Sequence, residues 1–117
     1  MPLPSGIGLE AAGKVDEVGE NITEFNIGDN IAYAAIPIGA YSQQRIIPAK
    51  IAVKIPEWIS FKLAATLMTK GLTTNYLLTK TYKLKANETI LFHAAAGGVG
   101  QISVSYTHLT LPTICSV

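Results

Sequence analysis

The chain has 117 residues, 49% of them apolar, and its nine basic and eight acidic residues give a formal net charge of +1. This balance leaves no basic stripe or polybasic cluster for nucleic acid or an anionic membrane surface. No apolar run approaches the roughly 20 residues that cross a bilayer, and the first residues show no signal peptide, so a cytoplasmic globular protein is expected. Cys115 is the single cysteine, which excludes an internal disulfide and a cysteine-built zinc site.

Short strands and turns are predicted for the first half of the chain. Residues 11–18 alternate small or apolar with charged side chains and end at a Gly-Glu-Asn turn, which is typical of a strand. Further strands are predicted at residues 31–35, 40–47 and 50–55. Because proline cannot donate to a sheet, Pro56 marks the end of this part. The first half therefore predicts a small, twisted, all-β unit.

A helical pattern begins after Pro56. Ser60 is of the residue type that caps helix N-termini, and apolar side chains follow it at helical spacing. Gly71 interrupts this pattern before an apolar face resumes. We therefore expect two helices, or one kinked helix, up to about Lys80.

An apolar segment at residues 89–94 precedes a run of small residues. The segment predicts a buried strand, and the run has the spacing Ala95-x-Gly97-x-x-Gly100. A strand that turns through glycines into a helix is how a dinucleotide pyrophosphate site begins. Alanine replaces the first glycine of the common fingerprint, so a turn with only a packing role would use the same residues.

The chain changes character after Ile102. Residues 103–117 are polar and β-branched, contain Pro112, and show no amphipathic repeat, so no helix is expected there. Residues 104–113 resemble the translation of a sequencing adapter that carries a transposon mosaic end. On that reading residues 103–117 are a non-native tail in which Cys115 and His108 have no biological role; a divergent natural terminus is the alternative.

Three stretches together resemble a known family. They are Leu-Pro-Ser-Gly-Ile-Gly-Leu-Glu-Ala-Ala-Gly at residues 3–13, Lys-Gly-Leu-Thr at 70–73, and Leu-Phe-His-Ala-Ala-Ala-Gly-Gly-Val-Gly at 91–100. With Gly-Ala-Tyr-Ser at 39–42, they are similar to the NADPH:quinone oxidoreductases, the zeta-crystallin-like branch of the medium-chain dehydrogenase/reductase superfamily. The resemblance runs from about residue 3 to residue 102.

In that family a GroES-like substrate domain precedes a Rossmann-type NADPH domain, and quinone is reduced in the cleft between them. The resemblance implies a mixed α/β chain. Its parts would be a partial GroES-like β domain (1–56), connecting helices (57–88), the first strand of a truncated Rossmann-type domain (89–102), and the tail (103–117). Such a fragment is expected to be inactive by itself, and its parent to be a homodimer.

The resemblance also implies the cofactor-binding residues, while no catalytic residue is assigned. They are Thr73, Tyr76, Gly97, Gly98, Val99 and Gly100. Tyr76 has the alternative of a core aromatic whose hydroxyl reaches the surface. For Lys70 the alternatives are a contact with phosphate or substrate and an ordinary solvated helix lysine, of which we expect the second. We expect His93 to be a hydrogen-bonded core histidine.

Zinc is not expected in this chain. Zinc alcohol dehydrogenases of the superfamily carry Gly-His-Glu where this sequence has Gly8-Leu9-Glu10, and leucine cannot ligate a metal. A quinone accepts hydride from NADPH without a Lewis acid, because its carbonyls are conjugated. The resemblance thus implies a zinc-free quinone reductase that uses NADPH.

Two other functions stay open at this point. A zinc-free enoyl or alkenal/one reductase would share the superfamily and the cofactor but reduce another conjugated substrate. A stand-alone GroES-like binding module would fold without affinity for a cofactor. The predicted helix and glycine turn after Pro56 argue against the binding module.

Overall fold

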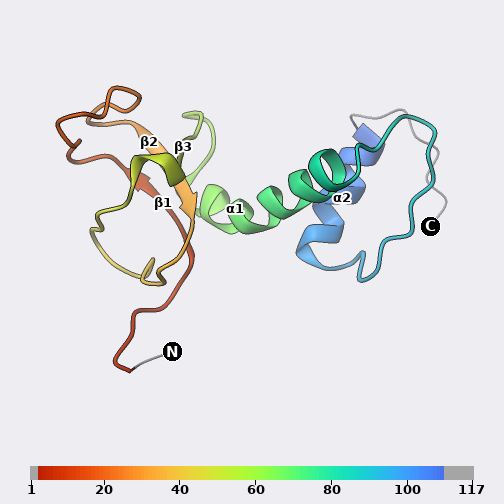
Figure 1. Ribbon diagram of the computed structural model, residues 1–117, viewed down its shortest axis with the longest axis horizontal. Helices are drawn as coiled ribbons and strands as arrows, with labels where there is room; N and C mark the ends of the chain where they lie inside the picture. Colours follow the sequence, from red (N-terminus) through yellow and green to blue (C-terminus); the bar gives the residue numbers. More distant parts are fainter. Residues whose placement is uncertain (1–2, 110–117) are drawn as a thin grey trace. The chain divides into compact units, whose positions relative to one another are not determined.

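A computed structural model of the chain describes residues 3–109 (Figure 1). The chain divides into two compact units, residues 1–68 and 69–117. The first unit holds a small antiparallel sheet, and the second holds a pair of helices with a long connection between them. This arrangement agrees with the predicted order of a β unit followed by helices.

Three antiparallel strands form the sheet in the order β1-β2-β3. They are β1 (Glu10–Lys14), β2 (Asn30–Ala34) and β3 (Ala52–Lys54). The central strand pairs Ala32 with Ala12 of β1 and with Val53 of β3. Ala32 is completely buried and Tyr33 nearly so, because a central strand is covered at both edges. The small β unit predicted from the sequence is confirmed.

The first strand is shorter than the predicted range of residues 11–18. It ends at Lys14, and the next residue instead exchanges backbone hydrogen bonds with the turn before β2. The Val15 N–H donates to the Asp29 carbonyl at 2.9 Å, and the Gly28 N–H donates to the Val15 carbonyl at 2.8 Å. The chain then leaves the sheet as an irregular loop.

The strand predicted at residues 40–47 is not formed, and only part of the one predicted at 50–55 is. Residues 41–47 form bends and irregular backbone with no ladder to a strand, and Arg45 donates to the Tyr33 hydroxyl at 3.3 Å and to the Pro37 carbonyl. A short 3₁₀ turn, η1 (Ala49–Ile51), then leads directly into β3.

Helix α1 (Phe61–Asn75) begins in the first unit and ends in the second. Its N-terminus is capped as predicted, since the Ser60 hydroxyl accepts a hydrogen bond from the Leu63 N–H at 3.2 Å. Gly71 does not break the helix, which continues into a π-helical turn, η2 (Tyr76–Thr81). Of the two alternatives left by the sequence, a single helix is formed.

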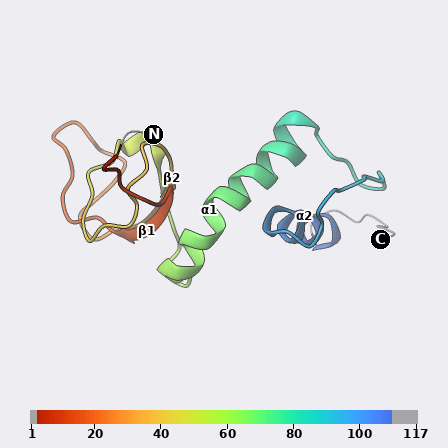
Figure 2. The ribbon, with the colours of Figure 1, turned by 90° about the horizontal axis from the view of Figure 1, so that it is seen from below.

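In the second unit, helix α2 (Gly98–Leu109) lies beside the later turns of α1 (Figures 1 and 2). The buried side chains are few and mixed in character. They are Thr74, Leu78, Leu84, Ser103 and Thr107. Hydroxyl groups thus occupy positions that an apolar stripe usually fills.

Two predictions for this unit are wrong. Residues 89–94 form no strand, and Leu91 is 85% exposed. No other strand lies beside them among residues 69–109, so their backbone has no ladder to join. Conversely, residues 103–109 continue α2, because Ser103 and Thr107 satisfy their hydroxyls on carbonyls of their own helix and can be buried there.

Within the described residues, neither helix is both long enough and apolar enough to pass through a bilayer.

Candidate functional site

The glycine-rich run forms a tight turn that opens α2. Ala94 adopts the left-handed conformation, with φ of 57°. The Gly97 N–H donates to the Ala94 carbonyl at 2.8 Å, and the Gln101 N–H then donates to the Gly97 carbonyl at 2.9 Å. The first of these bonds closes the turn and the second starts the helix. The predicted turn from small residues into a helix N-terminus is therefore present.

Gly100 is required by the backbone of this turn. A Cβ at this position would lie 2.3 Å from the Ala95 carbonyl oxygen and 2.6 Å from the Ala95 Cα. Backbone atoms cannot move aside as a side chain can, so a larger residue would have to open the turn. The last glycine of the predicted spacing thus permits the close return of the chain.

At Gly98 the neighbouring atoms belong to a side chain and not to the backbone. A Cβ there would lie 2.5 Å from Cδ and 2.7 Å from Cε of Lys70, which is on α1. The aliphatic part of Lys70 therefore passes over the first residue of α2, and the side chain is half-buried. The expectation of an ordinary solvated lysine is wrong, because the stem is packed against the glycine turn.

A pair of hydroxyls joins the same two helices one turn further along. Thr74 of α1 donates to the Val99 carbonyl at 3.3 Å, and Ser103 of α2 donates to the same carbonyl at 2.8 Å. The two hydroxyl oxygens lie 3.5 Å apart, and Ser103 is only 1% exposed. Thr74, Val99 and Ser103 fix the start of α2 against α1.

Thr74 and Ser103 were not among the residues predicted for the site. Their signal in the sequence was available, because Lys70 and Thr74 are four residues apart and so are Val99 and Ser103. Residues with that spacing share a helix face. Apolar periodicity does not reveal them, since a buried face made of hydroxyls and glycine has no apolar pattern.

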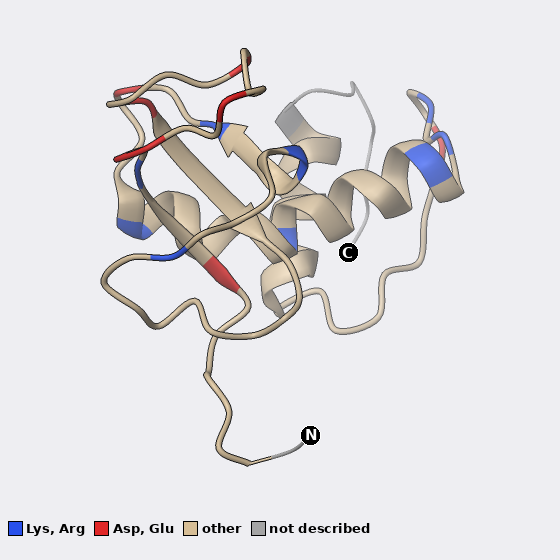
Figure 3. Cartoon of the chain, turned by 60° about the vertical axis from the view of Figure 1, so that its left-hand side comes forward, with Lys and Arg blue, Asp and Glu red and all other residues tan. Residues whose placement is uncertain are grey.

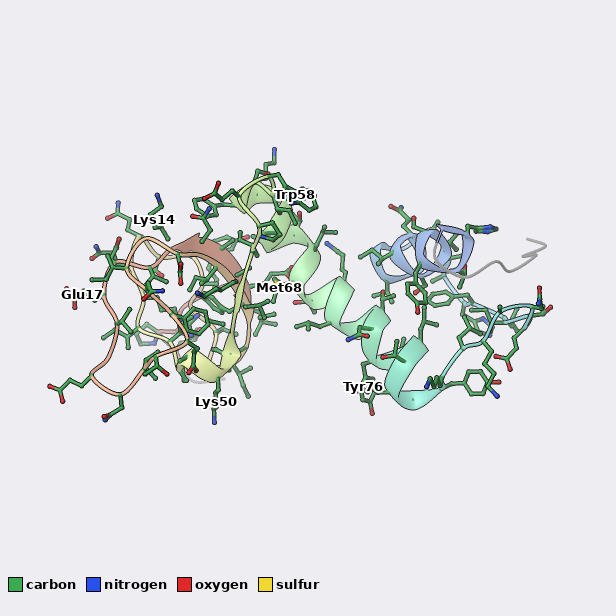
Figure 4. The ribbon with its side chains drawn as sticks, turned by 90° about the horizontal axis from the view of Figure 1, so that it is seen from above. Lys14, Glu17, Lys50, Trp58, Met68 and Tyr76 are labelled. Atoms are coloured by element: carbon green, nitrogen blue, oxygen red, sulfur yellow. The ribbon has the colours of Figure 1, made fainter. Side chains whose placement is uncertain are left out.

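The other two predicted site residues, Thr73 and Tyr76, belong to α1 and η2 and not to the glycine turn. The Thr73 hydroxyl donates to the Thr69 carbonyl of its own helix at 2.8 Å. Tyr76 is 61% exposed and is the first residue of η2, directly after α1 (Figure 4). Because a helix turns by about 100° per residue, Tyr76 leaves on nearly the opposite side from Thr74. Their contact with a cofactor stays a prediction, and the core alternative for Tyr76 is wrong.

His93 is exposed, and the expectation of a core histidine is wrong because its segment forms no buried strand. Among residues 3–109, no group of three or more His, Cys, Asp or Glu side chains is placed to hold a metal ion. Leu9 precedes β1 and is 44% exposed. Cys115 lies outside the described residues.

A loop between the two helices is closed around Glu88. Its carboxylate accepts from the Lys85 N–H at 2.8 Å and from the Tyr82 hydroxyl at 3.0 Å. These bonds, the one from Lys85 above all, hold the pKa of Glu88 below its usual value, and the Glu88 carboxylate raises the pKa of the Tyr82 phenol. At neutral pH Glu88 therefore stays ionised and Tyr82 stays protonated, so the hydrogen bonds that close the loop are kept.

The first unit contains an open groove of about 880 Å³. It lies between the loop that follows β1 and the irregular segment before η1, and Tyr33 and Arg45 meet in it, with the Arg45 guanidinium 5.5 Å from the centre of the Tyr33 ring. Carboxylates gather along the loop between β1 and β2 (Figure 3). Lys14 and Glu17 lie at the edge of this unit (Figure 4).

Comparison with known proteins gives a consistent result. A sequence model of the alcohol dehydrogenase GroES-like domain matches residues 1–57. A quinone oxidoreductase of Pseudomonas aeruginosa is 55% identical over 98 residues, which cover 84% of this chain and 30% of the relative. The chain is thus similar to quinone oxidoreductases over most of its length, and its first 57 residues match a GroES-like domain. The predicted fold class, a partial GroES-like β domain followed by helices, is confirmed.

Two further proteins are similar to the chain over nearly its whole length. The crystal structure of Escherichia coli quinone oxidoreductase complexed with NADPH superimposes with a TM-score of 0.87 at 47% identity, over 97% of this chain and 34% of that one. A 2-haloacrylate reductase of Burkholderia is 42% identical over 97% of this chain and 35% of the relative. The chain thus spans about a third of the length of the quinone oxidoreductases that it matches.

Proposed function

We propose that this chain supplies the GroES-like part and the pyrophosphate turn of an NADPH-dependent quinone oxidoreductase that transfers hydride to quinones without zinc. The observation on which this proposal rests is the turn at residues 94–100, which leads through glycines into the N-terminus of α2. The Escherichia coli quinone oxidoreductase, to which this chain is similar, is complexed with NADPH in its crystal structure.

The residues of the turn fit the phosphates of a dinucleotide. Gly97 carries no side chain that would keep a phosphate away from the backbone, and an α-helix leaves its first N–H groups without partners inside the helix. The second unit carries four lysines and a single carboxylate side chain, Glu88. A polyanionic ligand therefore meets little negative charge there.

NADPH, when bound, would supply the hydride. The chain's own part is to hold the pyrophosphate at Gly97 to Gly100 and to fix that turn through the Thr74 hydroxyl. Thr73 on α1 and Tyr76 on η2 are proposed to lie against the cofactor. Leu9 stands where the zinc enzymes have a histidine ligand, so a conjugated carbonyl that needs no Lewis acid suits this chain.

A second candidate function follows from the 2-haloacrylate reductase, which is similar over nearly the whole chain. An enoyl or alkenal/one reductase would use the same turn and the same cofactor, and would differ only in the conjugated acceptor. The binding-module alternative rests on the match of residues 1–57 to a GroES-like domain. It leaves the glycine turn and its links to α1 without a role.

A chimera tests the activity. Residues 3–102 would replace the matching segment of the Escherichia coli quinone oxidoreductase, and NADPH oxidation would be followed with 1,4-benzoquinone, 2-chloroacrylate and an enone side by side. Faster turnover of the quinone supports the proposal, and faster turnover of the enone or chloroacrylate supports the second candidate. A folded chimera that oxidises NADPH with none of the three would contradict both.

Several narrower points stay predictions. The 117-residue chain by itself is expected to turn over no quinone, and the parent is expected to be a cytoplasmic homodimer without nucleic-acid or membrane partners. The domain limits are expected at residues 56, 88 and 102. The adapter origin of residues 103–117 would be established by a nucleotide read that carries the adapter immediately after the Ile102 codon, and refuted by a genomic coding sequence that runs through Val117.

A further inference from the structure

Lys70 and Gly98 are complementary in shape. Three successive stem carbons of Lys70 occupy the space where a side chain at position 98 would begin, with Cγ at 3.3 Å, Cδ at 2.5 Å and Cε at 2.7 Å from that point. Lys70 is half-buried although it lies on a helix and carries a charge. A lysine whose stem is covered in this way contributes through packing as well as through charge.

The two glycines of the turn therefore differ in kind. The neighbour of Gly100 is the backbone of Ala95, which cannot be displaced without opening the turn. The neighbour of Gly98 is the far part of a flexible side chain. An alanine at 98 would push the Lys70 stem away and leave the turn itself folded. Removing the stem and adding a methyl group at 98 are thus two ways to break the same contact.

We propose that Lys70 is a positioning residue for the dinucleotide turn. Its stem holds the first residue of α2 against α1, one helical turn before the Thr74 hydroxyl does the same at Val99. The proposal rests on the proposed function, because it assigns the stem a role in ordering the turn that meets the cofactor. It assigns the ammonium group no contact with the ligand.

A double-mutant cycle tests this in the chimera described above. Lys70→Ala and Gly98→Ala are each expected to raise the dissociation constant of NADPH by about tenfold, measured by nicotinamide fluorescence. The double variant is expected to stay within about twofold of either single variant, because residues in contact couple in such cycles. Lys70→Met keeps the stem without the charge, and is expected to bind within about twofold of the parent chimera.

Lys80→Ala is the matched control, since Lys80 is an exposed lysine on η2 in the same unit, and no change is expected. An unchanged dissociation constant in Lys70→Ala overturns the proposal, as does a double variant that loses about a hundredfold. A loss in Lys70→Met as large as in Lys70→Ala overturns it too, because the charge would then be the active part. A parent chimera that is folded but binds no NADPH refutes the proposed function instead.

A second measurement distinguishes failure of the Lys70 proposal from failure of the proposed function. Lys70→Ala, Gly98→Ala and their double variant in the 117-residue chain give free energies of unfolding from urea titrations. The proposal expects that the effects of Lys70→Ala and Gly98→Ala do not add, whether or not NADPH binds. Additive effects there would show that the two residues are not in contact, and would overturn the proposal independently of the cofactor.

Discussion

The Thr74 hydroxyl donates a hydrogen bond of 3.3 Å to the Val99 carbonyl and so joins α1 to the first turn of α2. Ser103 donates to the same carbonyl at 2.8 Å, and both hydroxyl-bearing residues are buried. The start of α2 is thus fixed by polar contacts in a unit that has few buried apolar side chains. The position of the glycine turn depends on these contacts.

Thr74→Val and Ser103→Ala are each expected to destabilise the chain by about 1 kcal/mol, the usual net value of one hydrogen bond. Thr74→Val keeps the shape of the side chain and removes only the donor. Urea unfolding followed by circular dichroism measures the change. Ser105→Ala is the control, because Ser105 is exposed and donates only to Gln101 of its own helix. An equal loss in all three variants would contradict a specific role for Thr74 and Ser103.

Gly100→Ala and Gly71→Ala are expected to change stability in opposite directions. The methyl group at 100 collides with the Ala95 backbone, which costs about 2–3 kcal/mol as an overpacked site does. Gly71 lies inside α1 with no atom within 4 Å of an added Cβ, so alanine is expected to stabilise the helix by up to about 1 kcal/mol. Urea midpoints measure both changes. Equal effects would show that the turn is not closed as described.

The ion pair between Asp29 and Lys54 predicts a dependence of stability on pH. Lys54 Nζ lies 2.7 Å from the Asp29 carboxylate, and this contact is the main cause of a lowered Asp29 pKa. Because the folded-state pKa is below the unfolded value, the contribution is present above the unfolded pKa of about 3.9 and is lost as pH falls through the folded value. Asp29→Asn is expected to flatten the fall of the urea midpoint below pH 5.

The control for this experiment is Glu20→Gln, which removes an exposed carboxylate from the turn after β1. Its urea midpoint is expected to follow that of the unchanged chain from pH 6 to pH 3. High salt is expected to reduce the difference between Asp29→Asn and the unchanged chain, because Asp29 and Lys54 are both accessible to solvent. A difference that survives 1 M salt would contradict the ion-pair explanation.

Local signals in the sequence predicted the start of α1 and the centre of the sheet. Ser60 supplied the cap, and the patterns at residues 11–18 and 31–35 predicted the first two strands, which form at residues 10–14 and 30–34. These features depend on neighbours that are close in sequence or on a simple period. The glycine turn was also predicted, because small residues at a fixed spacing permit only a few backbone paths.

The errors concern segments whose structure depends on distant partners. Residues 89–94 have the composition of a buried strand, but a strand exists only beside another strand. Residues 103–109 have no apolar repeat, yet they continue a helix because Ser103 and Thr107 satisfy their own hydroxyls on helix carbonyls, and Ser103 lies against Thr74 of α1. The packing of Lys70 on Gly98 could not be read from either residue alone.

Trp58 provides a separate check on the first unit. It is 83% exposed in the turn before α1 (Figure 4). As the single tryptophan of the chain, it is expected to emit at the wavelength of solvated indole in the native chain, and to shift little on unfolding in urea. Emission from a buried indole would show that another surface covers Trp58 in solution.

The dissociation constant of NADPH tests the central claim most directly. It would be measured in the chimera that carries residues 3–102, with and without Gly100→Ala, and with Gly71→Ala as the control. We predict that the chimera and its Gly71→Ala variant bind NADPH with similar affinity, and that Gly100→Ala weakens binding by at least about tenfold while the protein stays folded. Equal binding by all three proteins would show that the turn at residues 94–100 is not the cofactor site.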